Sequence, residues 1–363
     1  MSKLQQTVTL AYFPKTNRTM KYALSLSILF CTFSCQNKDI DSQIQVETVS
    51  ITNFEGLKMK PKDITSNIQV LPLHTDTAGY IGQIKDICAI DSSIYLLDGS
   101  DFSLCKFNRK NGLLLQRISS RGNGPLEYLQ PIALTSDDDH IYVLDLPGMS
   151  ILSYNTNLQA EKKISTSFPC LDFIRTEKGF LCYNLSPTEN LQQIVYLDNK
   201  GQIISSYQLN HNSQAVSTGS KIFNRNSQGK IFITIPFSRT IYTWDTSSEK
   251  PIEYLSFDYT SQNIPDDIEL DKVNIWEKPY AIPCQFFQAK ESFLQSFLYQ
   301  EKRYHYIKSD SGNKLGIIPE DSEFPFFPQW QIDDYLVGTC SSDLLFSVSN
   351  YYDGEVLLFY TLK

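Results

Sequence analysis

A repeat of about 47 residues is the feature that most constrains how this chain can fold. The segment Ile94–Asp98 reads Ile-Tyr-Leu-Leu-Asp, and Ile141–Asp145, 47 positions later, reads Ile-Tyr-Val-Leu-Asp. The same offset aligns Cys105–Asn108 with Leu152–Asn155 without a gap. Each unit therefore predicts a strand that ends in Asp, a turn, a strand that ends in an aromatic residue and Asn, and a closing strand.

Weaker copies of this unit follow along the chain. They start near Gly179, Gly229, Ser292 and Tyr335. Six units of about 47 residues need roughly 282 residues, which fits the stretch from residue 68 to the end. Four-stranded units of this period are typical of β-propellers, whereas the alternative, a two-sheet sandwich, does not ordinarily repeat at this period.

The sequence thus predicts an all-β fold, a six-bladed β-propeller of four-stranded blades. Closing such a ring usually needs a strand from the far end of the chain, and Asn67–Leu73 precedes the first unit, so we expect it to complete the last blade. One break in the pattern, Pro265–Trp276, carries acids before loosely spaced apolar residues. It predicts a short helical insertion between the fourth and fifth blades.

The amino terminus has the layout of an export signal. Lys21 precedes the uncharged stretch Ala23–Phe33, which is followed by Ser34 and Cys35. A small residue directly before Cys35 resembles the lipobox of bacterial lipoproteins, in which the Cys becomes the lipidated first residue. We therefore predict a signal peptide over residues 1–34, with Met20 as the true start, a lipidated Cys35 with a tether and N-terminal extension over 35–66, and the propeller over 67–363. Simple secretion after ordinary cleavage is the alternative.

Charge and cysteine content narrow the possible partners. The net charge of −8 would fall to −12 on removal of residues 1–34, which carry four cations and no acids. A chain this acidic repels phosphate backbones, so we expect no nucleic-acid partner. Six cysteines remain beyond Cys35, without metal-type spacing, and buried free thiols are the simplest interpretation. Contact with a membrane is expected only through the lipid on Cys35.

One segment carries a resemblance to a known family. Residues 121–128 read Arg-Gly-Asn-Gly-Pro-Leu-Glu-Tyr, between one Ile-Tyr-x-x-Asp unit and the next. This resembles the G-x-G-P-x-E-Y segment of the six-bladed β-propeller lipoproteins of Bacteroidetes, which are similar in shape to NHL-repeat proteins. The resemblance extends from Ile68 to Tyr360 and implies a propeller at the bacterial outer membrane, on its periplasmic or surface face. It carries over no catalytic residues.

The same loop supplies the candidate ligand-binding residues. Arg121 offers a planar fork of donors, Glu127 accepts from hydroxyl or ammonium groups, and Tyr128 can stack on a sugar or aromatic ring. The alternative is structural: the two charges satisfy each other and the loop backbone, and Tyr128 packs between blades. The Asp137–His140 turn lacks the alternating acids of a Ca²⁺ loop, so a solvated hairpin is expected there, and we predict no metal or cofactor. His140 and His305 are the histidines to examine in a structure.

These observations favour a binding function. The expected function is an envelope-tethered module that holds a glycan, peptide or envelope protein over the central funnel of the propeller. The alternative is a propeller enzyme, a lyase or hydrolase acting on polysaccharide or peptide, whose site is assembled from several blades and so leaves no local motif. A third possibility, a sensory domain of a membrane complex, lacks an appended signalling segment. The sequence favours binding over catalysis and leaves the ligand open.

Overall fold

The computed structural model shows a chain that consists almost entirely of short β-strands in its described part. The described residues are 46–75, 79–209, 219–266, 268–269, 272–319, 324–345 and 354–363. The predicted signal peptide, Cys35 and the first part of the tether lie outside them. Within the described ranges, no helix has the length and apolar character needed to cross a membrane.

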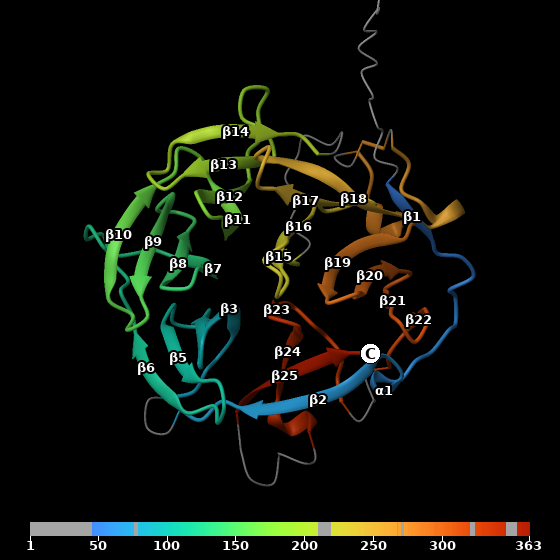
Figure 1. Cartoon of the computed structure of the whole chain (residues 1–363), viewed down its shortest axis with the longest axis horizontal. Coiled ribbons are helices and arrows are strands. Elements are labelled where there is room, and N and C mark those ends of the chain that lie inside the picture. Colours follow the sequence, from blue (N-terminus) through green and yellow to red (C-terminus); the bar gives the residue numbers. More distant parts are fainter. Residues whose placement is uncertain are drawn as a thin grey trace, which may run out of the picture. The chain divides into compact units, whose positions relative to one another are not determined.

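Six sheets form a ring around a common centre, as predicted, and each is a blade of a β-propeller (Figure 1). Blade one contains β3 (Ile84–Ile90), β4 (Ser93–Asp98), β5 (Leu104–Asn108) and β6 (Leu114–Ile118). Blade two contains β7 (Pro131–Ser136), β8 (His140–Asp145), β9 (Ser150–Asn155) and β10 (Ala160–Ser165). Blade three contains β11 (Cys170–Arg175), β12 (Gly179–Asn184), β13 (Ile194–Asp198) and β14 (Ile203–Tyr207).

The second half of the ring has the same plan with additions from the N-terminal segment. Blade four contains β15 (Phe223–Arg225), β16 (Ile231–Thr234), β17 (Thr240–Asp245), β18 (Lys250–Asp258) and β1 (Glu47–Ser50). Blade five contains β19 (Ile282–Ala289), β20 (Ser292–Tyr299), β21 (Lys302–Lys308) and β22 (Lys314–Gly316). Blade six contains β23 (Trp330–Ile332), β24 (Tyr335–Ser341), β25 (Glu355–Leu362) and β2 (Thr65–Pro72). The short helices are α1 (Pro61–Ile64), η2 (Thr260–Gln262), η3 (Ile275–Glu277) and η4 (Ser342–Leu344).

The ring closes through β2, which confirms the predicted closing strand. β2 pairs antiparallel with β25, the last strand of the chain, and its register runs from Asn67 opposite Thr361 to Pro72 opposite Val356. It is the outermost strand of blade six, so the first and last parts of the propeller are held by one hydrogen-bonded ladder. This pairing removes the free edges that an open ring would expose.

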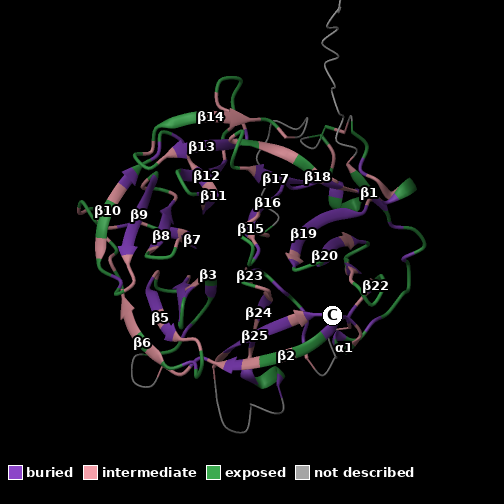
Figure 2. Ribbon diagram, viewed as in Figure 1, coloured by how far each residue is buried: buried purple, intermediate pink, exposed green. Residues whose placement is uncertain are grey.

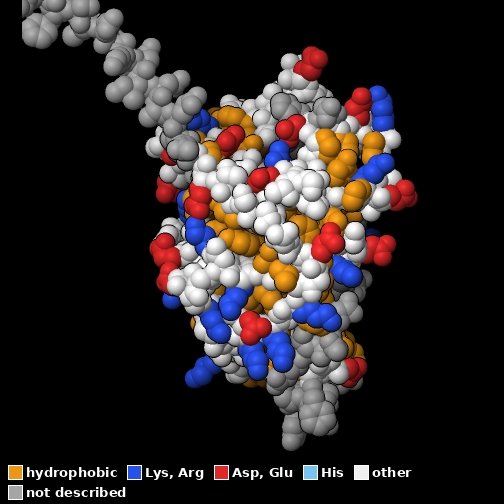
Figure 3. Space-filling model, turned by 90° about the vertical axis from the view of Figure 1, so that its right-hand side faces the viewer, with side chains coloured by type: hydrophobic (Ala, Val, Ile, Leu, Met, Phe, Trp, Pro, Cys, Tyr) orange, Lys and Arg blue, Asp and Glu red, His pale blue; other side chains and the backbone are white. Residues whose placement is uncertain are grey.

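The N-terminal segment before β2 borders three blades. β1 pairs parallel with β18, so it adds a fifth strand to blade four. Lys58 then forms a bridge with Ile317 beside β22 of blade five, and α1 leads directly into β2. On this side of the molecule, apolar side chains gather between charged side chains of both signs (Figure 3). The N-terminal extension is therefore partly structural from Glu47 onward.

The repeated Asp of the sequence has one structural role in both copies. Asp98 at the end of β4 accepts hydrogen bonds from the N–H groups of Gly82 and Gln83, each at 3.2 Å. Asp145 at the end of β8 accepts from Leu129 N at 3.0 Å and Gln130 N at 2.9 Å. Both carboxylates thus fix the connection that enters their blade, which explains why the sequence repeats an acid after four apolar residues.

Buried apolar side chains fill the space between neighbouring blades (Figure 2). Phe232 and Phe257 of blade four pack against Phe286 and Phe293 of blade five in one such cluster. The described residues include six cysteines, all of them free thiols, of which five are buried and Cys88 is partly exposed. In the expected insertion between blades four and five, the helical part within the described residues is the single turn η3.

Candidate functional site

A pocket of about 400 Å³ lies at the centre of the ring. Its lining comes from the innermost strands β3, β7, β11, β15 and β23 and from the hairpins that follow three of them. Asp137 follows β7, Ser227 follows β15 and Asp333 follows β23. Because all inner strands run in the same direction around a propeller, these hairpins share one face, and the pocket opens toward that face.

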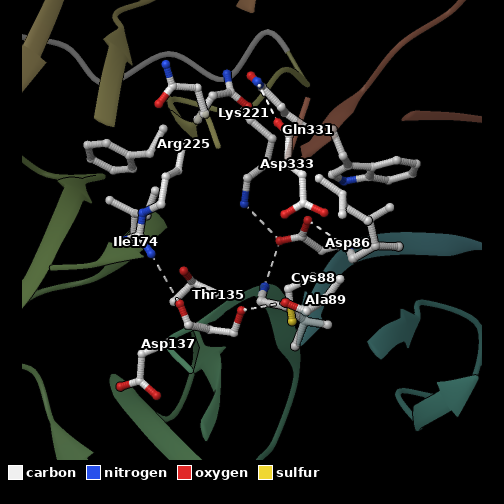
Figure 4. A pocket seen from close by; sticks show the side chains of 18 of the residues that line it. Asp86, Cys88, Ala89, Thr135, Asp137, Ile174, Lys221, Arg225, Gln331 and Asp333 are labelled. Atoms are coloured by element: carbon white, nitrogen blue, oxygen red, sulfur yellow. Dashed lines mark hydrogen bonds and ion pairs between the residues drawn. The ribbon is translucent and has the colours of Figure 1, made fainter. Parts of the chain in front are cut away.

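A buried ion-pair bridge lies at the inner wall of this pocket, and Figure 4 shows its contact between Lys221 and Asp86. Lys221 Nζ lies 2.8 Å from Asp86 Oδ2 and 2.8 Å from Asp172 Oδ1. The side chains of Asp86, Asp172 and Lys221 are 2%, 8% and 19% exposed. The three residues belong to blade one, blade three and the segment that enters blade four, so the bridge joins parts of the chain that lie far apart in sequence.

An irregularity of strand pairing precedes both Asp86 and Asp172. In β3 the pairing shifts between Ile84 and Asp86, and in β11 it shifts between Cys170 and Asp172. Such a bulge changes the direction in which the following side chain points. Asp86 Oδ2 also accepts from Leu134 N of blade two at 2.7 Å, and Asp172 Oδ2 accepts from the N–H of Ile222 at 2.8 Å. Each acid therefore clamps its blade to the next one.

The bridge keeps Lys221 positively charged. Burial alone would lower the pKa of Lys221, but the negative charges of Asp172 and Asp86 outweigh it and raise the pKa well above its usual value. Burial raises the pKa of Asp86, and the charge of Lys221 opposes that rise. A lysine held in this state cannot act as a nucleophile or accept a proton, so it serves as a fixed cation.

Two further polar side chains in the lining, those of Arg225 and Asn226, have hydrogen-bond donors that the described residues do not all satisfy. Arg225 donates from Nη1 to Ser136 O at 3.5 Å and from Nη2 to the carbonyl of Arg175, and it forms no ion pair with a described residue. Burial lowers the pKa of Arg225, and the charge of Arg175 lowers it further. Asn226 is 3% exposed, and its Nδ2 has no hydrogen-bond partner in the described part of the chain.

The loop predicted to bind a ligand lies elsewhere. It connects β6, the outermost strand of blade one, to the start of β7, so it is at the opposite end of the inner strands from the hairpins. The Arg121 guanidinium lies 5.1 Å from the centre of the Phe102 ring, and Glu127 Oε2 accepts from Gly124 N at 2.7 Å. Tyr128 is fully buried, and its hydroxyl donates to Phe102 O at 2.6 Å.

The predicted loop residues therefore make contacts within their own loop and with blade one. Arg121, Glu127 and Tyr128 are not part of the central pocket lining. Their role in ligand binding stays a prediction. Only the two acids of the bridge, Asp86 and Asp172, could have been found from a sequence signal, an Asp inside an apolar inner strand, as in Ile84–Cys88 and Cys170–Ile174. No local pattern marks Lys221 or Arg225.

Neither of the two histidines singled out from the sequence lines the central pocket. His140 lies with its ring nitrogens 3.4 Å from Asp137 and 3.3 Å from Glu161. His305 is buried, its Nδ1 is 2.9 Å from Ser296 Oγ, and burial lowers its pKa to about 3. Within the described ranges, no group of three or more His, Cys, Asp or Glu side chains is placed to hold a metal ion.

Comparisons with known proteins agree with this fold. A family profile described as a domain of unknown function, DUF4934, matches residues 42–355. A Bacteroides fragilis protein described as a predicted exported protein superposes with a TM-score of 0.74 at 18% identity, over 87% of this chain and 99% of that one. A Bacteroides vulgatus protein of the DUF4221 family gives a TM-score of 0.54 at 9% identity, over 82% of this chain and 97% of that one.

A comparison with curated proteins found no match. At these identities the solved structures show the fold, and both come from Bacteroides. The resemblance to six-bladed propellers of Bacteroidetes is therefore confirmed.

Proposed function

The chain belongs to the DUF4934 family, and from its propeller fold and central pocket we propose that it is an exported, non-catalytic binding protein. The ligand is held in the central pocket, and it is a glycan, a peptide or part of an envelope protein. The protein is tethered at the outer membrane by a lipid on Cys35. The signal-like stretch before Cys35 supports the export and the lipid anchor.

One observation carries the binding function: the pocket is polar, and four of its six charged side chains, those of Asp86, Asp137, Lys221 and Asp333, are already fixed by ion pairs. Lys221 is held by Asp86 and Asp172, and Asp137 accepts from Arg175 Nε at 3.1 Å. Side chains that are ordered before binding lose little freedom when the ligand arrives, so they give affinity and orientation at low entropic cost. A volume of about 400 Å³ is in the usual range of small-ligand sites.

The same ion pairs favour binding over catalysis. A general acid or base needs a pKa near the working pH and a proton that can leave or arrive. Lys221 is held in its charged form by two carboxylates, and the Asp137 pKa is lowered to about 2, because hydrogen bonds from Tyr142 and Arg175 outweigh the effect of burial. These groups are suited to recognising a ligand rather than to exchanging protons with it.

A matched pair of variants tests the pocket as the binding site. Ser227 and Gln228 are neighbouring exposed residues of the β15–β16 hairpin, but only Ser227 lines the pocket. Ser227→Trp places a large ring at the rim, while Gln228→Trp adds the same ring beside it. Labelled protein is applied to glycan and peptide arrays, and hits are verified by thermal shift. A ligand present at about 100 times its Kd should stabilise the wild-type protein by about 2.7 kcal/mol.

We expect Ser227→Trp to abolish binding of the ligand and Gln228→Trp to keep it. Equal binding by both variants would place the site outside the pocket. Turnover of a bound ligand, lost in Ser227→Trp, would instead show that the pocket is an enzyme site acting on polysaccharide or peptide.

A further inference from the structure

We propose that the ligand of the central pocket is an acidic sugar of the uronate class, and that Arg225 and Asn226 hold its carboxylate. This inference rests on the proposed binding function and specifies the chemistry of the ligand. Both residues lie at the end of β15 and the start of its hairpin, next to each other in the chain. Both are part of the pocket lining.

Arg225 forms no ion pair with a described residue, and the acids Asp137 and Asp138 attract it only at longer range. Its contacts are with two backbone carbonyls, of Ser136 and Arg175, and these occupy only the Nη1 and Nη2 atoms. A guanidinium has five N–H donors in a fork that fits a carboxylate. A partly buried positive charge without a directly paired carboxylate is costly, and an incoming carboxylate would reduce that cost. Figure 4 shows its side chain along the cavity wall beside Thr135.

Asn226 supplies a second donor whose orientation is fixed. Its Oδ1 accepts from the N–H groups of Gln228 at 3.2 Å and Lys230 at 2.9 Å, which determines which end of the amide is oxygen. The Nδ2 group therefore remains as a buried donor without a partner in the described part of the chain. Buried donors in proteins are nearly always paired, so an unpaired one in a pocket lining points to a ligand acceptor.

The other charged side chains of the lining, except the exposed Asp138, already have ion-pair partners. Asp137 is paired with Arg175, Asp333 with Arg109 at 2.6 Å, and Asp86 with Lys221. Asp138 is exposed at the rim. Arg225 is therefore the one cation in the described lining that has no carboxylate partner, and a ligand carboxylate would complete its site.

The remaining lining favours a hydroxylated ligand. It offers short hydroxyl and amide side chains, namely Thr135, Ser136, Asn224, Ser227 and Gln331. The Oε1 atom of Gln331 is buried and has no hydrogen-bond partner among the described residues. Trp330 also belongs to the lining, but its side chain is 4% exposed and packs in the apolar core between blades six and one. A sugar with one carboxylate matches this combination of an anion site and hydroxyl partners.

The test is calorimetric titration of the purified protein with D-galacturonate and D-glucuronate. Galactose and glucose serve as neutral sugars, and N-acetyl-L-glutamate serves as a carboxylate without a sugar ring. Arg225→Gln removes the charged fork. Asn226→Asp keeps the oxygen that accepts from the hairpin backbone and replaces the donor by an anion. Arg239→Gln is the control, because Arg239 pairs with Asp266 at 3.0 Å outside this pocket. Melting curves verify that every variant is folded.

We expect a uronate to bind the wild-type protein, and the neutral sugars to bind at least about 10-fold more weakly. Arg225→Gln and Asn226→Asp should each weaken the uronate by about 10-fold to 100-fold, and Arg239→Gln should leave it unchanged. Binding of N-acetyl-L-glutamate but of no uronate would overturn the sugar assignment. The carboxylate assignment would be wrong if Arg225→Gln had no effect or no acidic compound bound.

These results can be told apart from a failure of the proposed function. If a neutral ligand from the arrays binds and is blocked by Ser227→Trp, the pocket is still the binding site and only its chemistry has been misassigned.

Discussion

Substituting Lys221 by Met removes the cation that two buried carboxylates share. The side chains of Asp86 and Asp172, which are 2% and 8% exposed, would then lose the positive charge that lies 2.8 Å from each of them. Loss of one partner from a buried ion pair typically costs about 3–5 kcal/mol, because an uncompensated buried charge is left behind. We expect a loss of this size in the free energy of unfolding at pH 7.

The corresponding change in melting temperature follows from the size of the folded unit. Unfolding entropy of about 2.1 cal/mol/K per residue gives about 0.67 kcal/mol/K for roughly 320 residues, so each kcal/mol lowers Tm by about 1.5 °C. The predicted loss therefore lowers Tm by about 5–8 °C in calorimetry. Lys178→Met is the matched control: Lys178 also has an ion pair of 2.8 Å, with Glu249, but it is 68% exposed. Its replacement should leave Tm nearly unchanged.

The destabilisation should depend on pH. Burial already raises the pKa of Asp86, and loss of Lys221 would raise it further. A carboxyl group whose pKa is higher in the folded state favours folding below its unfolded pKa of about 3.9, and this contribution is lost as the pH rises through the folded pKa. The difference in free energy of unfolding between Lys221→Met and the wild-type protein should therefore be small near pH 4 and grow toward pH 7. A loss no greater than that of Lys178→Met, or one independent of pH, would refute the reasoning.

Three other predictions concern parts of the chain away from this bridge. Because burial lowers the His305 pKa to about 3, the unfolded chain binds a proton below about pH 6.5 that the folded chain does not; stability should fall by about 2 kcal/mol from pH 7 to 5, and His305→Gln should remove that part of the slope in melting curves. Tyr128→Phe removes the buried hydrogen bond to Phe102 O and should lower the free energy of unfolding by about 1–2 kcal/mol in denaturant titration; an unchanged midpoint would contradict the packing described. Cys35→Ser should move the protein from the membrane fraction to the soluble fraction, and retention in membranes would argue against the lipid anchor.

Much of the fold could be predicted from the sequence because propeller blades repeat their local chemistry. Asp98 and Asp145 lie at equivalent strand ends, and both accept hydrogen bonds from backbone N–H groups of the segment that enters their blade. Because the two blades make the same contact, the acid recurs in the sequence at the period of the blades. The closing strand was predictable for a similar reason: a ring of repeats needs a partner for its last blade, and residues 67–73 are the apolar run available.

The central site was not predictable in the same way. Lys221 and Asp86 are 2.8 Å apart in space but belong to different blades, so no spacing along the chain connects them. The bulge that directs Asp86 into the pocket is a feature of strand pairing, which the sequence does not display. The loop that did stand out in sequence, residues 121–128, owes its pattern at least partly to internal contacts such as that between Glu127 and Gly124.

The most direct test of binding in the central pocket is a crystal structure of the protein saturated with D-galacturonate. The sugar should occupy the pocket, with its carboxylate about 2.7–2.9 Å from the Arg225 guanidinium. A uronate bound instead at the loop of Arg121 and Glu127, with only water in the pocket, would contradict the account. The binding site would then lie at the opposite end of the inner strands.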